Sequence, residues 1–168
     1  MPQDNSTKFE IILNKFYDRI EKDETFFDYY NVDLSQAVEI ATNRAMNYLC
    51  EALDELSFVS NIDVDFSDYD RDLQQINFKL YPKEIKLIVE LMFLLYMKRD
   101  ETLLHAMEIN FTPSDLSVFS PANERTSYRN FIAQLEHNIE IRLDDYKNRD
   151  RVTNALKHTI NYGAYSEV

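Results

Sequence analysis

A single glycine, Gly163, occurs among the 168 residues of this chain. Glycine supplies positive φ angles and lets the backbone approach a ligand closely. Phosphate-binding loops, dinucleotide-binding fingerprints and nucleophile elbows therefore need several glycines, and this sequence cannot form any of them. The chain also has only four prolines, so it lacks the turn residues that a fold of many short strands requires. Both counts favour helices.

The net charge of the chain is strongly negative. Its 30 acidic and 18 basic residues give a formal charge of -12. Binding to a phosphate backbone or to an anionic membrane needs a basic face, which this balance disfavours. Three interpretations remain open: a surface that repels DNA, a surface that imitates DNA, and an acidic surface that serves only solubility.

The length and the cysteine content indicate an ordinary soluble domain. A chain of 168 residues buries roughly 70% of its unfolded surface when it folds as one domain. The polar N-terminus does not resemble a signal peptide, and no apolar run is long enough to span a bilayer. Cys50 is the only cysteine, so no internal disulfide forms. We expect a soluble protein of the cytoplasm.

Two helix-start signals occur in the first third of the chain. Thr7 opens a capping-box pattern and predicts a helix at about 8–22. Asp33 and Gln36 form a second box and predict a long helix at about 34–57. This long helix carries an alanine-rich stripe that another helix can approach closely: Val38, Ala41, Ala45, Leu49, Ala52 and Leu56.

Further helices are predicted beyond the middle of the chain. Pro82 fits the first position of a helix, and the almost wholly apolar run at 85–97 marks that helix as central. A separate short helix at about 100–108 follows. The longest helix is expected at about 121–147, and a last helical piece at about 150–158.

Together these elements predict an all-α fold. Residues 1–158 form a single-domain helical bundle with two long helices and one central apolar helix, and residues 159–168 form a C-terminal arm or tail. The chain has no repeat, no low-complexity segment and no internal domain boundary.

The acidic stretch 61–72, with the sequence NIDVDFSDYDRD, is the first candidate for a site. As a calcium loop it fails, because the sixth position needs glycine and holds Phe66. A catalytic carboxylate pair needs one buried member, whereas these aspartates alternate with apolar residues. The alternation predicts an extended connection between helices with one dry and one acidic face.

Histidine and cysteine indicate no catalytic or metal site. His105, His137 and His158 are far apart, and the Glu-x-x-His pattern of dimetal bundles is absent. His137 and Glu140 share a helix face and can hold a metal together, but a surface ion pair is the commoner arrangement. Cys50 reads as an inert buried thiol. We therefore predict no metal, no cofactor and no enzymatic activity.

Aromatic residues are abundant, with 11 Tyr and 11 Phe. Most must belong to the core. Tyr162 and Tyr165 are different, because a terminal tail has less core to reach. Exposed aromatic residues are common anchors for a partner protein, so the tail is the best candidate for an interaction site.

Three segments, FEIILNKFYDRIEKD, NFTPSDLSVFSPANERTSY and YKNRDRV, resemble small neck proteins of tailed bacteriophages of Gram-positive hosts. These are the head–tail connectors, or adaptors, which attach beneath the portal. The resemblance implies a helical bundle that forms a ring, usually of twelve copies, and that extends the DNA channel toward the tail. It implies a virion protein assembled in the host cytoplasm, with the portal protein, stopper or tail neck proteins and other copies of itself as partners. DNA would pass through without specific binding.

The resemblance assigns roles to three groups of residues. The C-terminal arm, with Gly163 as its pivot, would dock into the portal through Ile160, Tyr162, Gly163 and Tyr165. The acidic lining of the channel would consist of Asp63, Asp65, Asp68 and Asp70, although an outward-facing position fits these residues equally well. Contacts to a neighbouring subunit or to the portal would come from Arg142, Lys147, Arg149 and Arg151.

Two other functions fit parts of the sequence. An acidic DNA-mimic inhibitor would bind a basic nucleic-acid-binding partner through clustered carboxylates, but basic residues lie among the clusters of this chain and weaken the mimicry. A metal-dependent enzyme comes third, and it would carry bound metal after purification.

Overall fold

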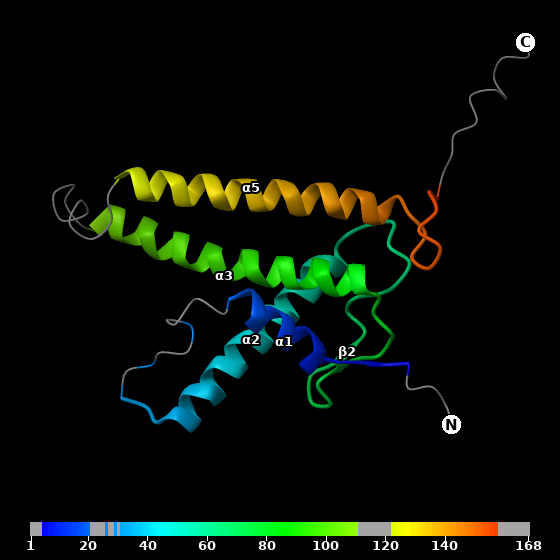
Figure 1. Cartoon of the computed structure of the whole chain (residues 1–168), viewed down its shortest axis with the longest axis horizontal. Coiled ribbons are helices and arrows are strands. Elements are labelled where there is room, and N and C mark those ends of the chain that lie inside the picture. The colour runs from blue at the N-terminus through cyan, green and yellow to red at the C-terminus, as the bar shows by residue number, and fades with distance from the viewer. Residues whose placement is uncertain (1–4, 21–25, 27–28, 30, 111–121, 158–168) are drawn as a thin grey trace, which may run out of the picture.

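The chain folds into a mostly helical structure with one small sheet (Figure 1). The computed structural model describes residues 5–20, 26, 29, 31–110 and 122–157. The helices of this part are α1 (Phe9–Arg19), α2 (Leu34–Ser57), α3 (Pro82–Asn110) and α5 (Ala122–Lys147). Its strands are β1 (Thr7–Lys8), β2 (Tyr69–Asp70) and β3 (Gln75–Ile76).

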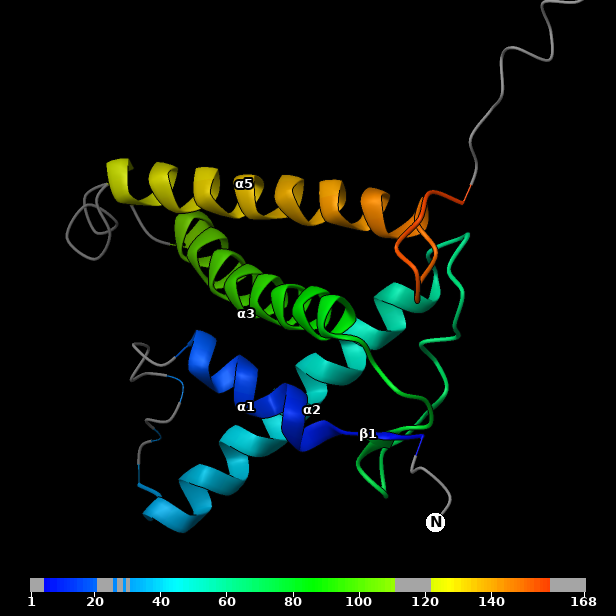
Figure 2. The ribbon, with the colours of Figure 1, turned by 45° about the vertical axis from the view of Figure 1, so that its right-hand side comes forward.

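Helix α3 is the centre of the fold. It lies beside α5, which runs in the opposite direction, and it packs against α1 and α2 on its other side (Figures 1 and 2). Its side chains Leu87, Ile88 and Met92 are buried. The prediction of a central apolar helix is therefore confirmed.

Four aromatic rings join the first three helices in the core. Phe16 of α1, Tyr48 of α2 and Tyr96 of α3 meet around Phe26, which follows α1 in the sequence. The ring centroids lie 5.8 Å apart for Phe16 and Phe26, 5.5 Å for Phe26 and Tyr96, and 6.1 Å for Tyr48 and Tyr96. Each pair of this kind contributes about 0.5–1.5 kcal/mol beyond its burial. Part of the high aromatic content thus serves the core.

The small sheet makes the prediction of an all-α fold only roughly correct. It is antiparallel, in the order β1-β3-β2, with Thr7 and Tyr69 on either side of Ile76. Thr7 does not cap α1 as predicted, because its hydroxyl donates to the carbonyl of Phe78 at 3.0 Å and accepts from the amide of Leu80 at 2.8 Å. These partners lie 71 and 73 positions away in the sequence, so no local pattern predicts them.

Helix α2 has the predicted bounds and the predicted cap. The carboxylate of Asp33 accepts a hydrogen bond from the amide of Gln36 at 2.9 Å, which lowers the pKa of Asp33. The alanine-rich stripe is buried at Ala41 and at every later position. Val38 is exposed, however, and Ala37 takes the buried position in that turn.

Two other predictions about helices are wrong. The separate helix expected at 100–108 is part of α3, which runs unbroken for 29 residues and exceeds α5, with 26 residues, in length. No proline or glycine occurs between 83 and 110, so nothing interrupts the helix there. The helical piece expected at 150–158 is a chain reversal over its described part. The predicted starts of α3 and α5 agree with the structure.

In the part of the chain that the structure describes, no helix combines the length and the apolar character needed to cross a membrane.

Candidate functional site

After α5 the chain reverses over residues 148–157, called here the C-terminal hairpin. An antiparallel bridge joins Arg149 to Leu156. The carboxylate of Asp150 accepts hydrogen bonds from the amide and the hydroxyl of Thr153, both at 2.6 Å, and these bonds lower the pKa of Asp150. The turn of the hairpin is therefore held by one ionised side chain.

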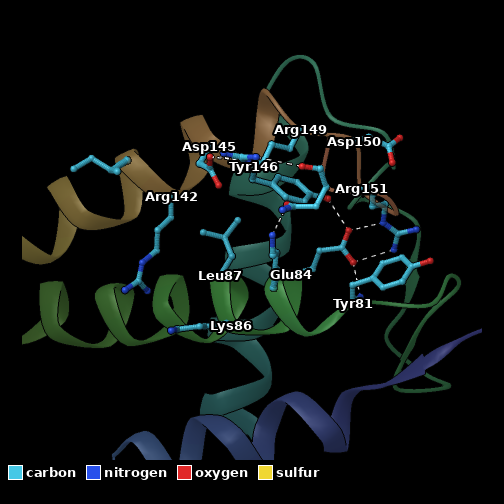
Figure 3. A pocket seen from close by; sticks show the side chains of 13 residues that line it. Tyr81, Glu84, Lys86, Leu87, Arg142, Asp145, Tyr146, Arg149, Asp150 and Arg151 are labelled. Carbon is cyan, nitrogen blue, oxygen red and sulfur yellow. Dashed lines mark hydrogen bonds and ion pairs between the residues drawn. The ribbon is translucent and has the colours of Figure 1, made fainter. Parts of the chain in front are cut away.

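Glu84, in the first turn of α3, is the charged residue at the centre of this region. Its side chain is 1% exposed. It accepts a hydrogen bond from the amide of Tyr81, just before the helix, at 2.6 Å, which is one half of a capping box. It also accepts from the hydroxyl of Tyr146 at 2.6 Å and from two guanidinium nitrogens of Arg151 (Figure 3). A buried carboxylate is thus fully paired at the positive end of a helix.

Arg151 comes from the C-terminal hairpin and reaches Glu84 across the start of α3. Its Nη2 atom lies 3.0 Å from Oε2 of Glu84, and it also donates to the carbonyl of Lys79. The guanidinium stacks over the rings of Tyr81 and Phe78, at 4.8 Å and 5.3 Å from their centroids. Salt bridge, hydrogen bond and cation–π contacts all fix this one side chain.

Burial raises the pKa of the Tyr146 hydroxyl, and the neighbouring Glu84 raises it further. The hydroxyl therefore stays protonated and donates to the carboxylate. Tyr146 belongs to the last turns of α5, so Glu84 connects three elements: α3, α5 and the C-terminal hairpin.

A second set of contacts ties the C-terminal hairpin to the connection after α2. The ammonium of Lys157 lies 2.9 Å from a carboxylate oxygen of Asp63 and donates to the carbonyl of Asn61 at 2.8 Å. The side chain of Asn61 donates to the carbonyl of Lys147 at 3.1 Å. The described chain therefore ends at a point that is fixed to the helical body.

A pocket of about 460 Å³ lies between the start of α3, the end of α5 and the C-terminal hairpin (Figure 3). Apolar and aromatic side chains line it together with several charged ones. The lining includes Tyr81, Leu87, Ile141, Tyr146, Lys83, Lys86, Arg142, Arg149 and Asp145, with the Glu84–Arg151 pair at one end.

The four basic residues predicted to contact a partner all bind carboxylates of their own chain. The pairs are Arg142 with Glu90, Lys147 with Asp144 at 2.7 Å, Arg149 with Asp145 at 2.6 Å, and Arg151 with Glu84. Three of them line the pocket, and Lys147 does not. The side chain of Arg151 is only 15% exposed, so little of it is left for an external contact.

The four aspartates predicted to line a channel lie at the surface and organise the connection between α2 and α3. Each accepts hydrogen bonds from within the chain. The donors are Arg151 and Lys157 for Asp63, Ser67 for Asp65, Asn77 for Asp68 and Leu73 for Asp70. The bonds from Ser67 lower the pKa of Asp65.

The predicted alternation of this connection is observed. Ile62 and Val64 pack against the core and Phe66 is fully buried, while Asp63 and Asp65 between them are exposed. The connection bends and turns rather than running straight.

His137, Glu140 and Cys50, which were candidates from the sequence, do not line this pocket. The Nδ1 atom of His137 lies 4.0 Å from a carboxylate oxygen of Glu140, and both side chains are largely exposed. Cys50 is buried, and burial raises the pKa of its thiol. Within residues 5–20, 26, 29, 31–110 and 122–157, no three His, Cys, Asp or Glu side chains are grouped so that they can hold a metal ion.

The four predicted portal contacts of the arm lie outside the described residues: Ile160, Tyr162, Gly163 and Tyr165.

Sequence reasoning missed Glu84 and Tyr146. A signal for Glu84 is present, because it is the third residue of a helix that begins at Pro82, where a capping carboxylate is expected. No signal predicts that Arg151, 67 positions later, pairs with it.

Comparison of the chain with protein-family models, with curated proteins and with solved structures found no match.

Proposed function

We propose that this chain is a structural head–tail connector, or adaptor, subunit of a tailed bacteriophage. In this role several copies form a ring under the portal, extend an acidic DNA channel toward the tail and join head to tail. The protein acts without catalysis and without a cofactor. Its partners are the portal protein, stopper or tail neck proteins and other copies of itself, and its place is the neck of the virion, after assembly in the host cytoplasm.

The proposal rests first on the resemblance of three segments to phage neck proteins, and the structure adds one supporting observation. Arg151–Glu84 and Lys157–Asp63 fasten the C-terminal hairpin to the helical body. Lys157, the last described residue, is therefore held against this body. An arm that docks on a separate protein benefits from such a fixed starting point, because less freedom is lost on docking.

The acidic surface fits the same role. Asp63, Asp65 and Asp68 are exposed and sit on a connection that is ordered by their own hydrogen bonds. Carboxylates on the wall of a channel do not neutralise phosphates, so DNA passes without being retained.

Quantitative mass spectrometry of purified particles, from the phage or prophage that encodes this chain, tests the proposal. We expect the chain at a level close to that of the portal subunit. Absence from the particles would refute the connector role, and the acidic-inhibitor alternative would then be pursued by isolating a basic partner from infected cells.

A further inference from the structure

The pocket between α3, α5 and the C-terminal hairpin has the dimensions of a ligand site. Its volume of about 460 Å³ falls within the range of roughly 300–1,000 Å³ that is typical of small-molecule sites. Leu87 projects into it from α3 (Figure 3) and is buried, and Ile141 of α5 also lines it with half of its surface exposed. The ring of Tyr146 lines it as well. An apolar group can therefore be covered on several sides.

The charge of the pocket differs from that of the chain. Five basic and three acidic residues line it, whereas the whole chain carries 18 basic and 30 acidic residues. Three of these basic residues are neutralised by carboxylates: Arg151 by Glu84, Arg149 by Asp145 and Arg142 by Glu90.

Two lysines and one aspartate of the lining lie outside these three ion pairs. Lys83 donates to the neutral side chain of Asn154. Asp150 is occupied by the backbone of its own hairpin. Lys86 is exposed, and among the described residues it has no hydrogen-bond or ion-pair partner. The pocket thus holds a surplus of about one positive charge, and Lys86 is a cation of the α3 wall that is free to bind an anion.

Arg142 stands on the same side of the pocket as Lys86. It extends from α5 toward α3, where Figure 3 shows both side chains beyond Leu87 and away from the Glu84–Arg151 pair. Its contact to Glu90 uses Nη1. A guanidinium has five N–H donors, so this contact leaves others for a second acceptor.

We propose that this pocket binds an organic monocarboxylate with an apolar body. The carboxylate lies between Lys86 and Arg142, and the apolar body covers Leu87 and Ile141. A single charge fits better than a phosphate dianion, because the pocket has a surplus of only about one positive charge. The site goes beyond the connector role, and its test is independent of particle assembly.

Two kinds of ligand could present a carboxylate and an apolar group to this pocket. One is a free organic acid. The other is an aspartate or glutamate side chain, with an apolar neighbour, on a second copy of the chain. Both place one carboxylate and one apolar group in the same pocket.

Titration of the ¹⁵N-labelled full chain with 4-phenylbutyrate, followed by NMR, tests the proposal. The neutral probe 4-phenyl-1-butanol has the same apolar body without the carboxylate. We expect shifts of the amide signals around Leu87, Arg142 and Tyr146, with a dissociation constant on the order of 1 mM. We expect the alcohol to bind at least about fivefold more weakly, because charge-assisted hydrogen bonds are lost.

Substitution separates this pocket from the general charge of the protein. Lys86→Gln is expected to weaken 4-phenylbutyrate binding about fivefold. Lys15→Gln removes the same charge from a neighbouring hollow and is expected to leave binding unchanged. Equal affinity for acid and alcohol, equal effects of the two substitutions, or no binding of either probe would overturn the proposal.

Light scattering distinguishes the two sources. If 4-phenylbutyrate, but not the alcohol, dissociates oligomers of the full chain, the natural carboxylate belongs to a second copy. If the acid binds and the molecular mass is unchanged, the natural ligand is a free organic acid. Both results support the pocket, and neither depends on whether the chain enters phage particles.

Discussion

Nη2 of Arg151 in the C-terminal hairpin lies 3.0 Å from Oε2 of Glu84 in the first turn of α3, although the two residues are 67 positions apart in the sequence. The same carboxylate also accepts the amide of Tyr81 and the hydroxyl of Tyr146. One buried acid therefore caps α3, holds the end of α5 and retains the hairpin. These functions are coupled, since a change at one partner alters the environment of the others.

Removal of Arg151 is expected to cost far more stability than removal of an exposed arginine. Arg151→Met leaves Glu84 as a buried charge without its cation, and we expect the free energy of unfolding to fall by about 3–5 kcal/mol. Urea denaturation followed by circular dichroism at neutral pH measures the loss. The double variant Glu84→Gln/Arg151→Met should recover part of it, because no charge is then left buried.

Arg142→Met is the matched control. Its ion pair with Glu90 is more exposed, at 47% for the arginine side chain, and such pairs contribute only about 0–1 kcal/mol. Losses of equal size in the two single variants would show that burial of Glu84 does not set the energetics of the region.

The stability of the protein should fall in alkaline solution, and Tyr69 should account for part of the fall. Burial raises the pKa of Tyr69 to about 12 from its ordinary value of 10.0, and its hydrogen bond to Asp54, at 3.1 Å, adds to the effect. The unfolded chain therefore loses this proton first as the pH rises. The stability contributed by the neutral tyrosine is complete below pH 10 and is lost between pH 10 and about 12.

Denaturation midpoints of the wild type and of Tyr69→Phe, measured from pH 8 to pH 11.5, check this prediction. We expect a flatter dependence above pH 10 in the variant, because phenylalanine has no proton to lose. Parallel curves for the two proteins would contradict the assignment.

Four of the described residues other than glycine have a positive φ angle, and three of them are asparagines. Asn31, Asn61 and Asn154 have φ angles of 58°, 66° and 61°, a region that most residues with a Cβ atom avoid. At Asn31 we expect alanine to lower the free energy of unfolding by about 1 kcal/mol and glycine to leave it nearly unchanged. Chemical denaturation of both variants measures the difference.

At Asn43 we expect alanine and glycine substitutions to rank in the opposite order of stability. It lies in the middle of α2 and is exposed. In a helix interior glycine is less favourable than alanine by about 1 kcal/mol. Alanine should therefore be the better substitute at Asn43 and the worse one at Asn31, and the same order at both sites would contradict the role given to Asn31.

Deletion of residues 159–168 should leave the described body intact and prevent incorporation into particles, if the chain is a connector subunit. The contacts that hold the C-terminal hairpin among the described residues reach to Lys157, and the truncated chain retains them. We expect an unchanged unfolding midpoint and no truncated protein in purified virions. The double variant Tyr162→Ala/Tyr165→Ala narrows the effect to the two expected anchors. Normal incorporation of the deletion would refute the role of the arm.

Much of the helical framework is predictable from short stretches of sequence. Asp33 correctly predicts the start of α2, and Pro82 correctly predicts the start of α3. The alanine-rich stripe of α2 was also predicted, and it is buried from Ala41 onward. The interior of α3 is recognisable as central from its composition alone. Each of these signals lies within one continuous stretch of sequence, so it can be recognised without knowledge of the fold.

The candidate site is predictable only in part. Arg142, Lys147, Arg149 and Arg151 were predicted together as contacts to a neighbouring subunit or to the portal, and the structure brings three of them, without Lys147, to one pocket. Their partners were not predictable, because Glu90 and Glu84 lie on α3, 52 and 67 positions away. Arg151 forms a buried salt bridge with Glu84, and the contacts of these basic residues to a partner stay a prediction.

Local sequence by itself determined where the long helices begin and which of their faces are apolar, because caps and periodicity depend on residues within one or two turns. Only the tertiary structure decided that Thr7 forms a strand with Ile76, that residues 148–157 form a hairpin, and that Glu84 receives Arg151. In each of these cases the favourable energy comes from a partner more than 60 positions away or from a turn held in place by such partners. A buried charge or an unpaired backbone group costs free energy unless it has such a partner. Which partner it has depends on tertiary packing and not on local preference.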